Sequence, residues 1–149
     1  MKKSWKYLMG SALSLLGFSG CINPLVPEMY GTPSADYKFL GDVKNTDGEP
    51  IEGVRVIMRP WGQEQDEMND TLFTDGKGHF EAEKLKFNFG SDLSRATVLV
   101  EDVDGEAHGA YASQTLKEKD LTIEQTKQGD GSWYEGAFTI KANVTMEKK

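Results

Sequence analysis

The chain has 149 residues, a formal net charge of −7 and a single cysteine. This length predicts one domain with a buried core, and one cysteine excludes an internal disulfide framework or a multi-cysteine zinc site. The acidic charge excludes the basic face that sequence-independent nucleic-acid binders need, so we expect no nucleic-acid partner.

The first twenty residues do not read as part of the fold. Three lysines precede an apolar stretch over residues 7–18, and the small residues Ser19 and Gly20 follow it. A charged start, a short apolar stretch and a small-residue exit are typical of a secretory signal peptide. As a helix, the twelve apolar residues would extend about 18 Å, which is too short for a hydrocarbon core of about 30 Å. We therefore expect residues 1–20 to be a removable leader.

The cysteine follows this leader directly. Phe18-Ser19-Gly20-Cys21 resembles the lipobox of bacterial lipoproteins. In that family the thiol receives a diacylglycerol and the chain is cut before the cysteine, which implies cleavage between Gly20 and Cys21. The alternative is an ordinary signal peptide followed by an incidental free cysteine. By the same resemblance, Ile22 after the cysteine implies transfer to the outer membrane, where we expect the periplasmic face.

Removal of the leader makes the chain more acidic. The leader carries three lysines and no acid, so the remaining 129 residues have 14 basic and 24 acidic side chains and a net charge of −10. Anionic lipid repels such a body, so we expect the acyl chains to hold it at the membrane. Residues 21–35 contain Pro24, Pro27 and Pro33, which predicts an extended, lipidated tether before a domain over residues 36–149.

The domain reads as all-β. Apolar and polar residues alternate over residues 138–146 and 54–59, the period-2 pattern of half-buried strands. Asp-Gly pairs predict hairpin turns, and they begin at Asp47, Asp75, Asp104 and Asp130. We expect seven or eight antiparallel strands in one two-sheet Greek-key sandwich. Further strands are expected at 37–43, 70–74, 79–83, 97–101, 109–113 and 121–125, and single helical turns near 63–69 and 114–119.

A family resemblance supports this fold class. Gly41-Asp42-Val43 and the run from Asp47 to Val56 resemble the opening hairpin of carboxypeptidase regulatory-like domains, and residues 70–75 with Gly78-His79-Phe80 resemble their second hairpin. The resemblance implies a small transthyretin-like β-sandwich and is nearly silent on function.

A narrower resemblance covers most of the chain. Cys21, Met29-Tyr30-Gly31-Thr32-Pro33, residues 101–107 and residues 131–136 are similar to the lipoproteins of radical-SAM/lipoprotein systems. That family is recognised by genes that lie beside a radical-SAM enzyme, so the resemblance implies a protein partner linked to such an enzyme. The chain is not that enzyme, because its iron–sulfur cluster needs three cysteines.

We find no catalytic constellation in the sequence. No serine or threonine has a histidine and an acid at a recognisable triad spacing, and acylation would consume the Cys21 thiol. His79 adjoins Phe80, so alternation predicts that His79 faces water if Phe80 is buried. We therefore expect a non-enzymatic accessory or interaction module without a cofactor.

Two segments are candidates for binding sites. Asp102, Asp104, Glu106 and His108 lie within seven residues around a glycine turn, as a calcium or transition-metal site would require; the alternative is a solvated turn. Trp133 and Tyr134, with Trp61 and Tyr111, are candidates for an aromatic glycan platform, and the alternative is packing at the end of the core. A glycan- or metal-binding envelope module is therefore the second functional hypothesis.

Overall fold

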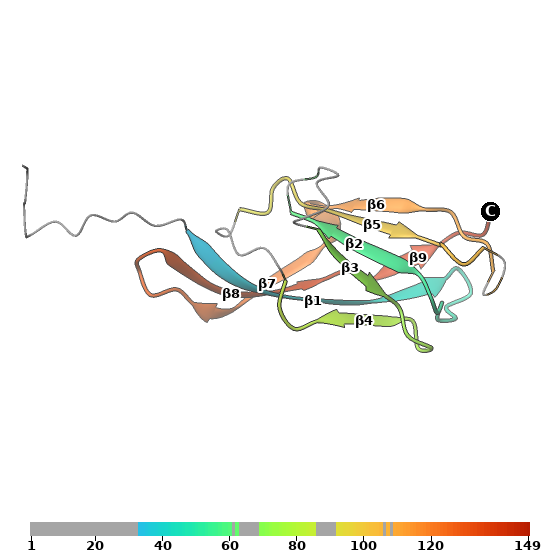
Figure 1. Cartoon of the computed structure of the whole chain (residues 1–149), viewed down its shortest axis with the longest axis horizontal. Coiled ribbons are helices and arrows are strands. Elements are labelled where there is room, and N and C mark those ends of the chain that lie inside the picture. The colour runs from blue at the N-terminus through green and yellow to red at the C-terminus, as the bar shows by residue number, and fades with distance from the viewer. Residues whose placement is uncertain (1–32, 61, 63–68, 86–91, 106, 108) are drawn as a thin grey trace, which may run out of the picture. The chain divides into compact units, whose positions relative to one another are not determined.

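Two β-sheets make up the part of the chain that the computed structural model describes, which is residues 33–60, 62, 69–85, 92–105, 107 and 109–149 (Figure 1). These residues belong to one compact unit, Gly31–Lys149. They form nine strands and a single 3-10 turn, which confirms the expected all-β sandwich. Among them, no helix is long and apolar enough to cross a membrane.

The first sheet is built around β1 (Ser34–Asn45). Its strand order is β4 (His79–Ala82), β1, β8 (Tyr134–Lys141) and β7 (Thr122–Gln128), and β9 (Val144–Met146) also pairs with β1. The β1–β8 and β1–β9 pairings are parallel, whereas β1–β4 and β7–β8 are antiparallel. The sheet is therefore mixed, and β1 begins two residues before the expected domain boundary.

The second sheet is antiparallel throughout. Its order is β3 (Asp70–Phe73), β2 (Arg55–Arg59), β5 (Thr97–Glu101) and β6 (Gln114–Lys117). We expected a helical turn near 114–119. This prediction is wrong for residues 114–117, which pair with β5, and the 3-10 turn Glu118–Asp120 follows them. The strand expected at 109–113 is reduced to one bridge between Tyr111 and Lys148. Residues 63–68 lie outside the described part of the chain.

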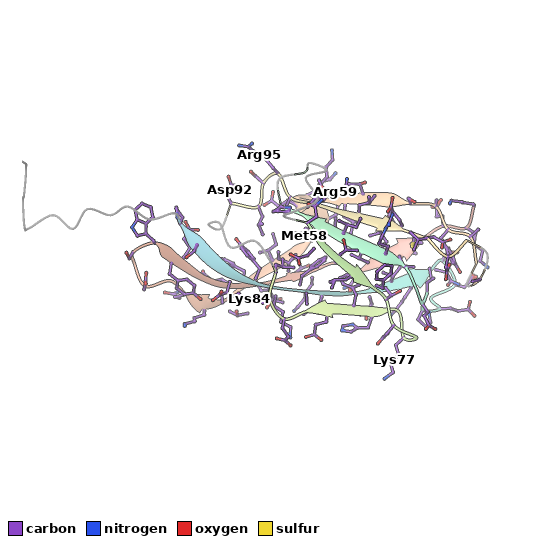
Figure 2. The ribbon with its side chains drawn as sticks, in the orientation of Figure 1. Met58, Arg59, Lys77, Lys84, Asp92 and Arg95 are labelled. Carbon is purple, nitrogen blue, oxygen red and sulfur yellow. The ribbon has the colours of Figure 1, made fainter. Side chains whose placement is uncertain are left out.

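The core lies between the sheets and follows the period-2 alternation. Along β1, Tyr37, Phe39 and Val43 are buried, and Phe39 meets Phe80 of β4 with ring centroids 5.1 Å apart. The alternation expected over 138–146 is confirmed, because Ile140, Ala142, Val144 and Met146 are all buried. Figure 2 shows Met58 of β2 between the two sheets.

The Asp-Gly turns mark corners as well as hairpins. The Asp130 turn joins the neighbouring strands β7 and β8, and the Asp104 turn lies in the longer connection between the neighbouring strands β5 and β6. The Asp75 turn leads from β3 in the second sheet to β4 in the first, and the Asp47 turn leads from β1 toward β2. The Asp75 segment therefore changes sheets where a hairpin was expected, whereas the Asp47 turn folds back in an antiparallel bridge between Lys44 and Pro50 before the chain crosses. Buried Thr74 holds the second corner, because its Oγ1 accepts the Val54 N–H at 2.9 Å and donates to the Ile51 carbonyl at 2.7 Å.

Candidate functional site

The β7–β8 hairpin carries the aromatic pair that the sequence analysis singled out. The Ser34 N–H donates to the Trp133 carbonyl oxygen at 2.8 Å. The Tyr134 hydroxyl donates to Asp36 Oδ2 at 2.9 Å, and this bond raises the pKa of Tyr134. Lys127 Nζ lies 5.6 Å from the centre of the Tyr134 ring. The backbone of Trp133 and the side chain of Tyr134 are therefore held against the start of β1, and the Tyr134 ring also lies near Lys127 of β7.

A glycine allows β8 to be irregular at this point. The β1–β8 register shifts between Ser34 and Ala35, and the β7–β8 register shifts between Gln125 and Lys127. Gly136 lies between these shifts with φ 118°, and a Cβ there would overlap the Lys127 carbonyl oxygen. Only glycine adopts this backbone readily, so Gly136 fixes the local path of the strand beside Tyr134.

A hollow of about 530 Å³ opens at this hairpin. Aromatic, amide, hydroxyl and carboxylate groups line it together with two glycines: Gln125, Gly129, Gly131, Ser132, Tyr134, Glu135 and Phe138. The Gln125 side-chain amide donates to the Glu135 carbonyl oxygen at 3.1 Å. Such a mixture of ring faces and polar groups is what a polar, ring-shaped ligand requires.

Tyr37 closes the aromatic cluster from the core side. Its ring stacks on Phe138 with centroids 5.6 Å apart and planes 25° apart, and the side chain is 1% exposed. Burial, reinforced by the negative charges of Glu135 and Asp92, raises the pKa of Tyr37 to about 12. The phenol is therefore neutral at every physiological pH.

A row of charges crosses the outer face of β1 and β4. His79 Nδ1 lies 3.0 Å from Asp42 Oδ1, and His79 Nε2 lies 3.6 Å from Glu81 Oε2. The hydrogen bond to Asp42 raises the pKa of His79, burial opposes this shift, and Glu81 reinforces it. Phe80 is buried and His79 is half-exposed, which confirms the predicted orientation. The two ring nitrogens face different carboxylates, so the three groups do not converge on one point.

Lys38 extends this charge row. Its ammonium pairs with Glu81 and also lies 2.9 Å from Glu83. Two residues after the end of β4, Lys84 Nζ lies 3.9 Å from Asp36 of β1 (Figure 2 labels Lys84). The outer face of β1 and β4 is therefore balanced by its own ion pairs. These residues therefore do not form a surface of one charge sign, which would attract an oppositely charged partner.

The acidic turn after β5 uses one of its carboxylates for structure. Asp102 Oδ2 accepts the Tyr111 N–H at 2.8 Å, which closes the loop between β5 and the Tyr111 bridge. Asp104 is in the same turn, while Glu106 and His108 lie outside the described residues. Within the part of the chain that the structure describes, no three His, Cys, Asp or Glu side chains are grouped to hold a metal.

Tyr134 lines the hollow, whereas Trp133 is not among the lining residues, and Tyr134 has neighbours that we did not predict. Asp36 was assigned to the beginning of the domain, yet Ser34, Asp36 and Lys38 already alternate with apolar residues in the sequence. This period-2 signal would have placed β1 and the Tyr134 partner. Glu135, Gln125 and Phe138 meet through two register shifts, which leave no pattern in the sequence. Tyr111 is buried in the core, whereas Trp61, Gly20 and Cys21 lie outside the described residues.

Comparisons with known proteins give structural neighbours only. No protein-family model matches the chain, and no curated protein matches it in sequence. The chain is similar in fold to 3-chlorocatechol 1,2-dioxygenase from Rhodococcus opacus 1CP, with a TM-score of 0.51, 12% identity and 83% of this chain covered. It is also similar to the dioxygenase domain of a dioxygenase carbohydrate-binding protein fusion from Streptomyces sp. SirexAA-E, with a TM-score of 0.50, 11% identity and 84% of this chain covered.

A third neighbour is catechol 1,2-dioxygenase from Pseudomonas arvilla C-1, with a TM-score of 0.47, 11% identity and 80% of this chain covered. The match spans 54% of that chain and 64% of the Rhodococcus chain, compared with 86% of the Streptomyces domain. Identities this low establish the shared fold alone.

These neighbours correct one prediction. The sequence analysis expected a non-enzymatic chain because no catalytic constellation was visible. That prediction is contradicted, because the chain shares its fold with the Rhodococcus and Streptomyces dioxygenase structures. The absence of a recognisable triad spacing was a weak reason, since catalytic groups are assembled by the fold and not by proximity in sequence.

Proposed function

We propose that this chain is a lipid-anchored protein of the bacterial envelope. Acylated Cys21 holds the β-sandwich at the periplasmic face of the outer membrane, where it acts as an interaction module. The observation that carries this proposal is the position of the sole cysteine, directly after the small-residue exit of a twelve-residue apolar stretch and thirteen residues before β1.

Chain length supports this arrangement. Twelve residues lie between Cys21 and Ser34, and the thirteen Cα–Cα steps from one to the other reach at most about 45 Å when fully extended. Three prolines among the twelve residues favour extended backbone. Two or three acyl chains give stable attachment, since each buried CH₂ contributes about 0.8 kcal/mol. The acidic domain is thereby kept near lipid that it would otherwise leave.

The anchor is tested in the cells that produce the protein, by metabolic labelling with an alkyne fatty acid. We expect label and the corresponding increase in mass on the wild type, and neither on Cys21→Ala. Ser19→Ala is the matched control, because it keeps a small residue in the leader exit and should still be labelled. Label that persists on Cys21→Ala, or a wild type without label, would overturn the proposal.

The partner follows from the resemblance to lipoproteins of radical-SAM/lipoprotein systems. We propose a protein partner whose binding depends on the neighbouring radical-SAM enzyme. The test is a pull-down of the anchored protein from its own cells, with the enzyme present or deleted, followed by mass spectrometry. A partner that requires the enzyme supports the proposal, and the same set of bound proteins in both strains contradicts it.

The hollow at the β7–β8 hairpin supports a second candidate function, binding of an envelope glycan. Calorimetric titration with chitooligosaccharides and with soluble peptidoglycan fragments tests it. Glu135→Gln changes a carboxylate that lines the hollow, whereas Glu124→Gln changes one on β7 that pairs with Lys141 at 3.0 Å. We expect weaker binding only for Glu135→Gln; a wild type that binds neither probe excludes this candidate.

A further inference from the structure

The tether leaves the domain beside the tip of the β7–β8 hairpin. Ser34 is the first residue of β1, and its N–H donates to the Trp133 carbonyl oxygen at 2.8 Å. Two residues farther along β1, Asp36 accepts a hydrogen bond from the Tyr134 hydroxyl. Figure 1 shows the start of β1 and the β7–β8 tip at the same end of the sheets. Any anchor that precedes Ser34 therefore acts on the domain at this tip.

The tip, residues 129–134, has a single charged side chain of its own, and Asp36 and Lys127 lie beside its Tyr134. Asp130 is the only residue of the tip that is charged near neutral pH, and its Oδ1 accepts a hydrogen bond from the Ser132 N–H at 2.9 Å. Trp133 and Tyr134 each keep part of their surface exposed. Tryptophan and tyrosine are the residues that favour the lipid headgroup region, because an apolar ring and a polar group lie on one side chain.

The opposite end of the sandwich is acidic. The turns at residues 46–53, 74–78 and 102–105 meet there, where Figure 1 also marks the C-terminus. They carry six carboxylates, and Lys77, which Figure 2 shows pointing outward, is the only base in them. The six are Asp47, Glu49, Glu52, Asp75, Asp102 and Asp104. Lys148 and Lys149 of the C-terminus lie at the same end, and anionic headgroups repel the carboxylates of its turns.

We propose that the β7–β8 tip is the membrane-facing end of the domain, with Trp133 at the lipid headgroups and the acidic turns directed away. This proposal rests on the anchor at Cys21. The twelve residues between Cys21 and Ser34 reach at most about 45 Å from the cysteine to β1. This tether holds the tip at a roughly millimolar effective concentration, so that a weak contact is sufficient. The partner-binding surface is then left on the faces and the acidic end.

Fluorescence quenching tests the orientation on the protein purified from its producing cells and reconstituted into phosphatidylethanolamine–phosphatidylglycerol vesicles. Trp61→Phe leaves Trp133 as the only tryptophan after the leader. The matched control combines Trp61→Phe and Trp133→Phe with Phe73→Trp, because Phe73 is 58% exposed at the end of β3 beside the acidic turns. Both variants receive lipid with a nitroxide on the headgroup.

We expect a loss of Trp133 emission and unchanged emission from the Phe73→Trp variant. Equal quenching of both, quenching of neither, or quenching of the Phe73→Trp variant alone would overturn the orientation. Hydrogen exchange of the unsubstituted protein is a second measurement, in which vesicles should slow exchange at residues 129–134 and not at residues 46–53. A protein that does not enter the vesicles would overturn the anchor itself, which distinguishes the two failures.

Discussion

The Tyr134 hydroxyl donates a hydrogen bond to Asp36 Oδ2 across 2.9 Å, although the two residues lie 98 positions apart. This contact joins the start of β1 to the start of β8, next to the irregular backbone of β8 at Gly136. Tyr134→Phe keeps the ring and removes the bond. We expect a decrease of a few degrees at most in the unfolding temperature and faster hydrogen exchange at the start of β1.

The matched variant for this contact is Asp36→Asn, which keeps an acceptor and removes the charge. Because the hydrogen bond to Asp36 and its charge raise the pKa of Tyr134, we expect that pKa to fall toward its ordinary value of about 10. Ultraviolet titration measures the change. An unaltered Tyr134 titration in Asp36→Asn would show that the contact is not formed in solution.

Tyr37 should make the fold sensitive to alkali. Its pKa is raised to about 12, so the folded state holds the phenolic proton more tightly than the unfolded state, whose pKa is about 10. The stabilisation is complete below pH 10 and is lost as the pH rises toward 12. Denaturant titrations at several pH values should show this decline, and Tyr37→Phe should make it less steep. Equal slopes in both proteins would contradict it.

His79 should give a smaller effect near neutrality. The Asp42 hydrogen bond raises its pKa, so the contribution to stability is complete below about pH 6.5 and is lost as the pH rises through the higher folded-state value. The pair is exposed, which makes the effect small. Nuclear magnetic resonance titration of His79 measures its pKa, and Asp42→Asn should lower that pKa. A His79 titration that Asp42→Asn leaves unchanged would rule out the contact.

Gly41 has no room for a side chain. A Cβ there would overlap the Ala142 carbonyl oxygen and lie 2.7 Å from Phe80 Cζ. Because the first obstacle is backbone, Gly41→Ala should destabilise the fold by about 3 kcal/mol. Gly48→Ala is the control, since nothing lies within 4 Å and only its φ of +83° adds a cost of about 1 kcal/mol. Chemical denaturation compares them, and equal losses would contradict the steric explanation.

Thr74 is expected to stabilise the corner between the sheets. Thr74→Val keeps the shape but leaves the buried Val54 N–H and Ile51 carbonyl without their hydroxyl partner, at a cost of about 2 kcal/mol. Thr74→Ser keeps the hydroxyl and removes one methyl group, which costs about 1 kcal/mol. The order of the two midpoints in urea tests this prediction, and a Thr74→Ser variant that is the less stable one would reverse it.

Most of the fold could be predicted from the sequence because apolar and polar residues alternate along the strands. Ile140 and Val144 were assigned to the buried face because period-2 patterning depends on neighbours two residues apart. The Asp-Gly pair at Asp75 was wrongly read as a hairpin, because a turn motif specifies the backbone path and not which strands pair after it. At Asp47 the chain does fold back, with an antiparallel bridge between Lys44 and Pro50. The parallel β1–β8 pairing joins distant segments and has no local signal.

The candidate site could likewise be predicted only in part. Trp133 and Tyr134 were identified by residue type, whereas Asp36 and Glu135 were not, since their proximity depends on strand order and on the register shifts at Gly136. Glu106 and His108 remain predictions, as does the anchor at Cys21. What the structure adds is the position of the tether exit relative to the aromatic tip, which the sequence alone does not contain.

The parallel pairing of β1 with β8 and β9 affects when the first sheet can form during synthesis. The strand nearest the beginning of the domain has Ser34 opposite Tyr134, one hundred residues later. The first sheet therefore cannot close until the last strands have been synthesised, and contacts between such distant segments form slowly. Phe39 can meet Phe80 of β4 early in synthesis, whereas Tyr37 has no ring to stack on until Phe138 of β8 has been added.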